Sequence, residues 1–291
     1  MSTVESLSPK QVAQALGVSE ASLKRWCDRG LLESLRTAGG HRRIPVSSVI
    51  KYLREKGQPP IKPELLGLPT ATGHGEVTAA KVRELAHTAL ISGDEQQFRR
   101  SVFNMFMAPY SACDIFDQVL TPALHLIGAE WEHGSVEIFH ERRACEMCQR
   151  LIYELRAILP PLTEGVPVAI GAALSDDRYT LAPAMAETAL REAGWRAEHY
   201  GVHLPAASVC AAIAERAPRL VWIGAGYIAD APRFRSDLEK IYAAAQAVGA
   251  ALALGGRAIV PELRADLRYN VFCERFRDLV AFADALKPRP T

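Results

Sequence analysis

The sequence predicts a multidomain chain: an α domain with a β wing, an α-helical bundle, and an α/β domain with a doubly wound parallel sheet. The N-terminal region is basic and contains two short helical patterns followed by a hairpin signal. A long helical region follows, and short apolar runs then alternate with helical patterns. We therefore expect a domain at 1–56, a linker at 57–75, a four-helix bundle at 76–160 and a sheet domain at 161–291.

The first domain begins with a helix-turn-helix pattern. Ser8 suits an N-cap, Pro9 suits the first helical position, and Gly17 permits the turn. A second helix follows over about residues 20–29, with polar and basic residues on its outer face. This is the geometry of a helix that enters the major groove of DNA. We predict that it contacts DNA through Ser22, Lys24, Arg25 and Arg29.

A hairpin wing is expected over about residues 35–44, because a Gly-Gly pair accepts the positive φ of a tight turn. Cations at such a tip are well placed to meet phosphates, which supply most of the sequence-independent affinity for DNA. The charge balance agrees, because residues 1–56 carry ten Lys and Arg against five Asp and Glu. The predicted wing contacts are Arg36, Thr37, Gly39, Gly40, His41, Arg42 and Arg43.

This domain resembles the winged helix-turn-helix of the MerR family over about residues 6–56. The resemblance rests on Val12-Ala13, Leu16-Gly17-Val18, Arg25-Trp26 and Arg36–Arg43. It implies that the partner is double-stranded DNA. Typical members continue into a long dimerisation helix, but Gly57–Pro69 is rich in proline and cannot continue one.

The helical region contains four amphipathic segments with short breaks, which predicts an antiparallel bundle. The segments span 77–91, 96–107, 111–131 and 136–159. Cys145 and Cys148 form a Cys-x-x-Cys pair with no second pair to complete a metal site. We expect structural thiols in a reduced, cytoplasmic protein. No run of about 18 apolar residues suits a membrane span, so no membrane partner is expected.

The last region alternates strands and helices. Strands are expected at 166–173, 196–200, 220–223, 250–254 and 269–272, and helices at 180–193, 206–217, 232–248 and 275–286. Ligands of such sheets bind beyond the C-terminal strand ends, where glycine lets a large ligand approach the backbone. The glycines at these ends are Gly201, Gly224, Gly255 and Gly256.

A bundle followed by a five-stranded domain resembles the cobalamin-binding module of methionine synthase and of CarH-type light-sensing regulators, over about residues 76–286. That family has an Asp/Glu-x-His-x-x-Gly loop after the first strand, whose His coordinates cobalt from below. The corresponding loop here keeps Asp177 but has Tyr179 for the His and Ala182 for the Gly. The family's serine after the third strand is Gly224, and its Gly-Gly is Gly255-Gly256.

CarH-type proteins also carry a Trp, nine residues, then Glu-His in the bundle, which enclose the upper face of the corrin. Here the pattern has Trp131 and Glu141, but Arg142 replaces the His. His133 lies at the expected mouth of the bundle, and His203 lies near the end of the second strand. The candidate cofactor residues are therefore Trp131, His133, Glu141, Arg142, Asp177, Tyr179, Gly201, His203, Gly224, Gly255 and Gly256.

The tyrosine changes the expected chemistry. Neutral imidazole is a good cobalt or iron ligand, whereas a phenol needs deprotonation or a hard trivalent metal such as haem iron. Binding of cobalamin through a lower histidine is therefore not expected. Three alternatives stay open: haem or a linear bilin, cobalamin that keeps its own base, or no ligand. No metal ligand is assigned.

An enzyme is not expected, because no chain is left for a substrate barrel and the glycine loops lack GxGxxG and P-loop patterns. The sequence predicts a transcription regulator whose sensor module binds a tetrapyrrole, with light, redox state or ligand level as the signal. Ligand binding would control DNA binding or oligomerisation, and a homo-oligomer on repeated half-sites is expected. The alternative is a ligand-independent regulator that uses a vestigial sensor domain for oligomerisation.

Overall fold

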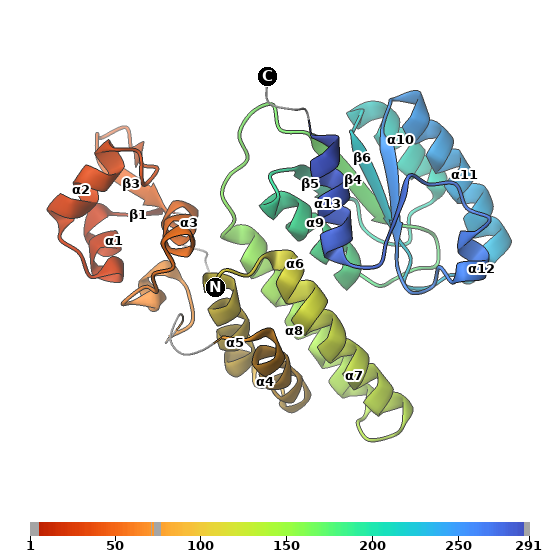
Figure 1. Ribbon diagram of the computed structural model, residues 1–291, viewed down its shortest axis with the longest axis horizontal. Helices are drawn as coiled ribbons and strands as arrows, with labels where there is room; N and C mark the ends of the chain where they lie inside the picture. The colour runs from red at the N-terminus through yellow and green to blue at the C-terminus, as the bar shows by residue number, and fades with distance from the viewer. Residues whose placement is uncertain (1–5, 71, 73–76, 288–291) are drawn as a thin grey trace. The chain divides into compact units, whose positions relative to one another are not determined.

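A computed structural model describes residues 6–70, 72 and 77–287 of the chain (Figure 1). The chain divides into two compact units, residues 1–161 and 162–291. The predicted multidomain fold is confirmed, since a small α domain with a wing and a helical bundle make up the first unit, and a parallel-sheet domain makes up the second. Residues 71 and 73–76 of the predicted linker lie outside the described residues.

The N-terminal domain starts with a capped helix-turn-helix. Helix α1 (Pro9–Leu16) has a capping box at Ser8, and the turn residue Gly17 has a φ of 65°. Helix α2 (Glu20–Asp28) has Ser19 as its N-cap. Both helices lie where the sequence predicts them, because the caps and the turn glycine determine their ends.

A small antiparallel sheet in the order β1-β3-β2 completes this domain together with helix α3 (Val46–Lys56). The strands are β1 (Ser6–Leu7), β2 (Leu35–Arg36) and β3 (Arg42–Pro45). Leu23, Leu32 and Ile44 are fully buried between the helices and the sheet. Trp26 packs on Tyr52 of α3, with 5.2 Å between ring centroids. The domain thus has its own apolar core.

The segment after α3 contacts the domain that it follows. It contains a short 3-10 helix, η1 (Pro63–Leu66). Just before this helix, the backbone N–H groups of Ile61 and Lys62 donate to the carbonyl of Ala15 at 2.8 and 3.1 Å. Leu66 and Leu68 are buried. The described part of the predicted linker is therefore packed. The predicted domain boundaries stay predictions.

Helix α4 contacts the helices α5, α7 and α8 of the bundle and the turn that precedes α7. The helices are α4 (Ala79–Ser92), α5 (Glu95–Met107), α6 (Ala112–Ile115), α7 (Thr121–Glu132) and α8 (Ile138–Ala157). A π-helical turn, η2 (Phe116–Leu120), joins α6 to α7 inside the third predicted helix. Ion pairs join the helices, as between Arg99 of α5 and Glu154 of α8 at 2.6 Å.

The bundle cysteines are free thiols, as the sequence predicts. Cys148 is fully buried, and burial raises its pKa. Burial, followed by the nearby charge of Glu141, raises the pKa of Cys145 to about 12. Because the thiolate is the reactive form, both side chains are inert near neutral pH and act as packing residues.

The second unit is a five-stranded parallel sheet in the order β5-β4-β6-β7-β8. Its strands are β4 (Val168–Ala173), β5 (Arg196–His199), β6 (Leu220–Gly224), β7 (Ala251–Gly255) and β8 (Val271–Cys273). Helices α9 (Leu181–Glu192) and α13 (Phe276–Leu286) cover one face, and α10 (Ala206–Arg216) and α11 (Ala231–Ala247) cover the other (Figure 1). The five strands and four helices expected from the sequence are confirmed, and a short helix, α12 (Pro261–Arg264), was not expected.

One close approach inside the sheet demands a glycine. Gly171 of β4 lies beside Trp222 of β6, and a Cβ at position 171 would fall 1.9 Å from the indole ring. Trp222 is 4% exposed, so its ring fills this interior space. None of the helices in the described parts of the chain is long and apolar enough to cross a membrane.

Candidate functional site

The recognition helix α2 exposes most of the side chains predicted to contact DNA. Lys24, Arg25 and Arg29 are exposed, and Arg29 is the C-terminal cap residue of the helix. Ser22 is half-buried, and its hydroxyl oxygen accepts a hydrogen bond from Arg25 at 3.1 Å. Spacings of three and four residues place Ser22, Arg25 and Arg29 on one face. The helix therefore has a basic face, on which a hydrogen bond to Ser22 orients the guanidinium of Arg25.

The wing has the turn that the Gly39-Gly40 pair predicts. The N–H of Thr37 donates to the carbonyl of His41 at 2.9 Å, and Gly40 has a φ of 76°. The hydroxyl of Thr37 accepts from the N–H of His41 at 3.2 Å. Arg36, His41 and Arg43 are exposed around this turn. Thr37 and the glycines shape the turn, while the cations lie at its surface.

Arg42 is placed differently from the other wing cations. Its Nη2 lies 2.7 Å from Oδ1 of Asp28 at the end of α2, and its side chain is 19% exposed. Its hydrogen bond holds the pKa of Asp28 below the usual value and raises the pKa of Arg42. This contact could not be predicted from local sequence, because the partners lie fourteen residues apart on different elements.

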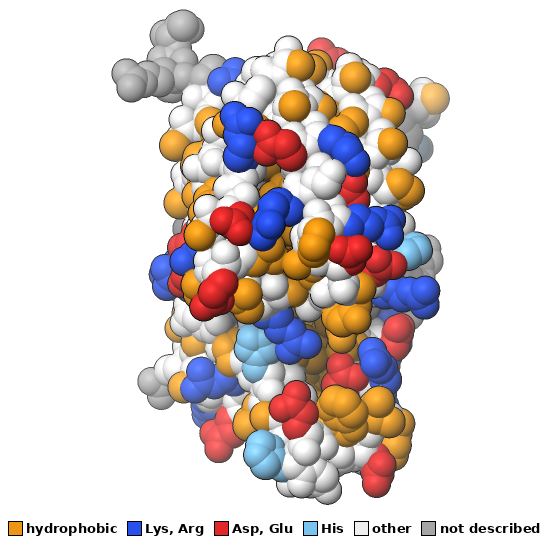
Figure 2. All heavy atoms as spheres, turned by 90° about the vertical axis from the view of Figure 1, so that its right-hand side faces the viewer, with side chains coloured by type: hydrophobic (Ala, Val, Ile, Leu, Met, Phe, Trp, Pro, Cys, Tyr) orange, Lys and Arg blue, Asp and Glu red, His pale blue; other side chains and the backbone are white. Residues whose placement is uncertain are grey.

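Charge elsewhere on the surface is mixed. On the face shown in Figure 2, Lys and Arg side chains are interspersed with Asp and Glu, and hydrophobic side chains lie between them. No patch of one sign covers that face of the described residues. The basic surplus of the sequence lies in residues 1–56, where the helix and wing cations are. This distribution favours the N-terminal domain as the surface that meets a polyanion.

A buried carboxylate organises the C-terminal edge of the parallel sheet. Asp177 is 3% exposed, and its Oδ1 and Oδ2 accept from the N–H groups of Tyr179 at 3.0 Å and Gly226 at 2.6 Å. Its backbone carbonyl accepts from the N–H of His203 at 2.9 Å. Asp177 therefore ties together the loops after β4, β5 and β6. Hydrogen bonds to an ionised acceptor are the stronger kind, so the loops are firmly held.

His203 is part of the same loop structure. Its Nδ1 accepts from the backbone N–H of Asp176 at 2.8 Å, and both residues have positive φ values, 58° and 77°. Because Nδ1 accepts this hydrogen bond, the proton of the neutral imidazole lies on Nε2. Neither nitrogen then offers a lone pair to a metal. The contact favours a loop-holding role for His203.

Tyr179 forms an exposed flat surface at this edge. Its side chain is 42% exposed, and its ring lies on the backbone of Gly226, where a Cβ would meet the ring at 3.0 Å. The guanidinium of Arg257 lies 5.9 Å from the ring centroid. Tyr227 is 52% exposed in the next loop. Sequence reasoning missed Gly226, Tyr227 and Arg257, because only the loop contacts bring them to Tyr179.

The four predicted glycines at the strand ends differ in role. Gly224 and Gly255 are paired neighbours on β6 and β7. Gly256 has a φ of 119°, and a Cβ there would fall 2.2 Å from the carbonyl oxygen of Ala225. Gly201 has a φ of 100°. Gly201 and Gly256 are thus needed for backbone shape. A Cβ at Gly255 would fall 3.0 Å from the carbonyl oxygen of Cys273, whereas one at Gly224 would lie 3.8 Å from the Pro183 side chain.

The bundle candidates lie at the end of α7 and the start of α8, in the first unit. Trp131 is 43% exposed, and Nδ1 of His133 lies 2.6 Å from the carbonyl oxygen of Ala129. Arg142 pairs with its neighbour Glu141 at 3.3 Å. Cys145 also contacts Glu141, with 3.5 Å between Sγ and Oε1. The indole is thus available at the surface, and the Glu141 carboxylate is already engaged.

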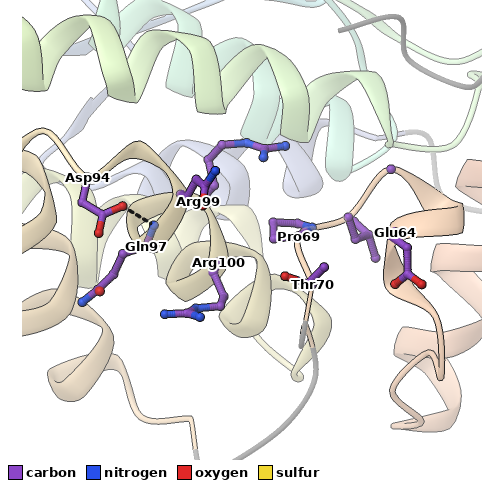
Figure 3. A pocket seen from close by; sticks show the side chains of 10 residues that line it. Glu64, Pro69, Thr70, Asp94, Gln97, Arg99 and Arg100 are labelled. Atoms are coloured by element: carbon purple, nitrogen blue, oxygen red, sulfur yellow. Dashed lines mark hydrogen bonds between the residues drawn. The ribbon is translucent and has the colours of Figure 1, made fainter.

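A hollow of about 360 Å³ lies elsewhere in the first unit (Figure 3). It is bounded by the segment after α3 and by the first turns of α5, where Gln97 donates to Asp94 at 2.9 Å. Arg99 on its wall is held by Glu154. None of the residues predicted from the sequence lines it. It is therefore not the predicted cofactor site.

Two segments of the first unit match known domain families. Residues 6–57 match the helix-turn-helix domain family, and residues 82–156 match the B12 binding domain family. The chain joins a helix-turn-helix domain to a B12 binding domain. The predicted pairing of a DNA-binding domain with a cobalamin-binding-type module is therefore confirmed. No curated protein matches the chain.

Solved structures with a similar fold include corrinoid proteins. A monomethylamine corrinoid protein of Methanosarcina barkeri has 13% identity and a TM-score of 0.59, and the match covers 72% of this chain and 100% of that chain. A cobalamin-binding protein of Desulfitobacterium hafniense DCB-2 has 14% identity, a TM-score of 0.39 and coverages of 71% and 98%. The methanol:cobalamin methyltransferase complex MtaBC of Methanosarcina barkeri has 15% identity, a TM-score of 0.38 and coverages of 92% and 92%. The first similarity shows a shared fold.

The side chains at the C-terminal edge of the sheet do not fit a cobalt ion held by a lower histidine. Tyr179 stands where the resemblance predicts the ligating histidine, and Nδ1 of His203 is occupied by a backbone N–H. Among the described residues, no group of three or more His, Cys, Asp and Glu side chains could hold a metal ion. The ring of Tyr179 is exposed and lies against the backbone of Gly226.

Proposed function

We propose that this protein is a transcription regulator whose B12 binding module senses a tetrapyrrole and thereby controls DNA binding. The observation that carries the proposal is the Asp177 loop structure, which holds an exposed Tyr179 ring beside Arg257 at the ligand-binding edge of the sheet. Parallel sheets bind ligands at this edge. The N-terminal domain supplies the DNA-binding surface.

The ligand would stack on Tyr179, with a guanidinium at its rim. Arg257 is exposed and suits a carboxylate on the ring edge. Haem and bilins carry such carboxylates, and tyrosine is a known haem ligand, so both stay candidates. Cobalamin that keeps its own base is the third candidate. The resemblance to CarH-type modules adds four candidate cofactor residues from the bundle: Trp131, His133, Glu141 and Arg142.

Two further parts of the proposal concern the response. A single DNA-binding domain of this size has limited affinity, so we propose a homo-oligomer on repeated half-sites. The ligand would change oligomerisation or DNA affinity, with light or redox state acting through the bound tetrapyrrole. We propose a regulator and not an enzyme, because the matched helix-turn-helix domain gives the chain a DNA-binding function.

The test is to purify the full-length protein from a host supplied with cobalamin, haem and biliverdin. We expect a coloured protein whose visible absorbance and mass spectrum identify one bound tetrapyrrole. Trp131→Ala should reduce loading more than Tyr179→Phe, because the phenylalanine ring still stacks. A colourless protein that binds none of the three, yet binds DNA, would support the alternative of a ligand-independent regulator.

A further inference from the structure

We infer that Arg42 is a positioning residue and does not contact phosphate. Its ion pair with Asp28 holds the wing against the recognition helix, and we call this pair the lock. The inference rests on the proposed function only in that the N-terminal domain binds DNA. It replaces the expectation that all the wing cations meet the phosphates. The structure separates Arg42 from the others by what its guanidinium touches.

The guanidinium of Arg42 reaches across from β3 to the last turn of α2. Its Nη2 lies 2.7 Å from Oδ1 of Asp28, and its Nη1 donates to the carbonyl oxygen of Lys24 at 3.4 Å. Two nitrogens on two acceptors of one helix define an orientation as well as a distance. A cation is also favoured at the C-terminal end of a helix by the helix dipole.

Asp28 offsets a charge conflict inside the hairpin. Arg42 stands directly opposite Arg36 in the β2–β3 register, and like charges in that position destabilise an antiparallel pair. The charge of Arg36 also reaches Asp28, where it lowers the pKa of the carboxyl group together with Arg42 and Lys24. One carboxylate therefore compensates cations from both strands and from the helix.

Arg43 is the matched contrast. Successive side chains of a strand point to opposite faces, so Arg43 and Arg42 leave β3 on different sides. Arg43 is exposed and makes no ion pair within the described residues, whereas the Arg42 side chain is mostly covered. Of the two neighbouring arginines, Arg43 is the one free to contact phosphate.

If the lock exists, removing the charge of Asp28 should change DNA affinity in the direction opposite to that expected from electrostatic repulsion alone. Removing an acidic charge from a DNA-binding surface reduces repulsion from phosphates, and should therefore tighten binding. If Asp28 instead holds the wing in place, its removal loosens the wing and weakens binding. The salt dependence of binding distinguishes a phosphate contact from a residue that only holds the wing, because its slope depends on the number of cations that contact phosphates.

The experiment measures fluorescence anisotropy of the full-length protein on a labelled duplex that it selects from a random-sequence pool. Across a salt series, Asp28→Asn and Arg42→Ala should each weaken binding about three- to tenfold with an unchanged salt slope. The double variant should be no weaker than either single one. Arg43→Ala should lower the slope by about one charge. Glu55→Gln, which removes an exposed acidic charge from α3, is the control and should bind normally or slightly tighter.

Rescue distinguishes a lock from general damage. The swapped variant, Asp28→Arg with Arg42→Asp, should bind more tightly than either single reversal, since it restores an ion pair. The inference would be wrong if Asp28→Asn bound DNA more tightly with a steeper salt dependence. It would also be wrong if Arg42→Ala lowered the slope of the salt dependence by about one charge. If the protein selects no duplex, the proposed function fails, and urea unfolding of the same variants still decides whether Asp28 and Arg42 are energetically coupled.

Discussion

The carboxylate of Asp177 shows how a single residue defines the ligand edge. Both of its oxygens accept backbone N–H groups, so the site needs a side chain with two acceptor atoms. The partly buried N–H of Gly226 has this carboxylate as its partner, and leaving such a donor without a partner is costly. The two carboxylate oxygens thus join the loops after β4 and β6, and the backbone carbonyl of the same residue holds the loop after β5.

Asp177→Asn should lower the free energy of unfolding of the sheet domain by about 1–3 kcal/mol, because the amide NH₂ would face one of the two N–H donors. Urea unfolding monitored by circular dichroism measures the change. Asp176→Asn is the matched control, since the Asp176 side chain lies at the surface with only a 3.6 Å pairing to Arg233. Equal stability of the two variants would contradict the role of Asp177.

We propose that the residue at position 179 determines which tetrapyrrole binds. Tyr179→His would restore the imidazole that CarH-type modules have at this place, so we expect cobalamin uptake to rise relative to the wild-type protein. The absorbance spectrum after incubation with hydroxocobalamin and gel filtration measures uptake. If the wild-type protein binds adenosylcobalamin tightly with its lower base displaced, the account of Tyr179 is wrong, and His199 becomes the next ligand to test.

At the scale of elements, the pairing of β4 with β6 depends on the fit of glycine to indole. Gly171→Ala should destabilise the sheet domain by about 1–3 kcal/mol, because its Cβ would overlap the Trp222 ring. Gly224→Ala is the control in the same sheet, since its Cβ would lie at 3.8 Å from Pro183. In a Trp222→Leu background the Gly171→Ala cost should shrink. An equal cost in both backgrounds would contradict this packing.

The elements were largely predictable, and the contacts between them were not. Caps such as Ser8 and Ser19, the wing glycines and the strand–helix alternation are local signals, and they placed the elements within a few residues. The π-helical turn at Phe116–Leu120 has no local sequence signal, so the third bundle helix was expected to be continuous. The Arg42–Asp28 and Asp177–Gly226 contacts join distant residues, and only the fold brings them together.

At the scale of the whole molecule, the DNA-binding domain and the bundle share one unit. Arg54 of α3 donates to the carbonyl of Tyr110 at 2.8 Å, and its guanidinium lies 3.9 Å from the centroid of the Phe106 ring. Buried cation–π and hydrogen-bond contacts of this kind resist separation. These contacts join the bundle to the helix that follows the wing.

Limited digestion with a glutamate-specific protease tests this division of the chain. We expect the first cut after Glu164, which is exposed in the segment between the two units, to give fragments of residues 1–164 and 165–291. Glu64 should be cut later, because its 3-10 turn packs against α1. Mass spectrometry of the fragments that appear first shows the order in which the two sites are cut. A first cut at Glu64 would show that the N-terminal domain is held loosely.

The central claim is that a tetrapyrrole bound to the sheet domain changes DNA binding. The most direct measurement is the anisotropy of a labelled duplex titrated with full-length protein, with and without the tetrapyrrole identified by mass spectrometry. The absorbance of the same sample reports whether the ligand is bound. The account predicts a change in apparent Kd of about tenfold, which corresponds to a coupling free energy of about 1.4 kcal/mol. Identical DNA affinity in samples whose absorbance shows bound tetrapyrrole would contradict it.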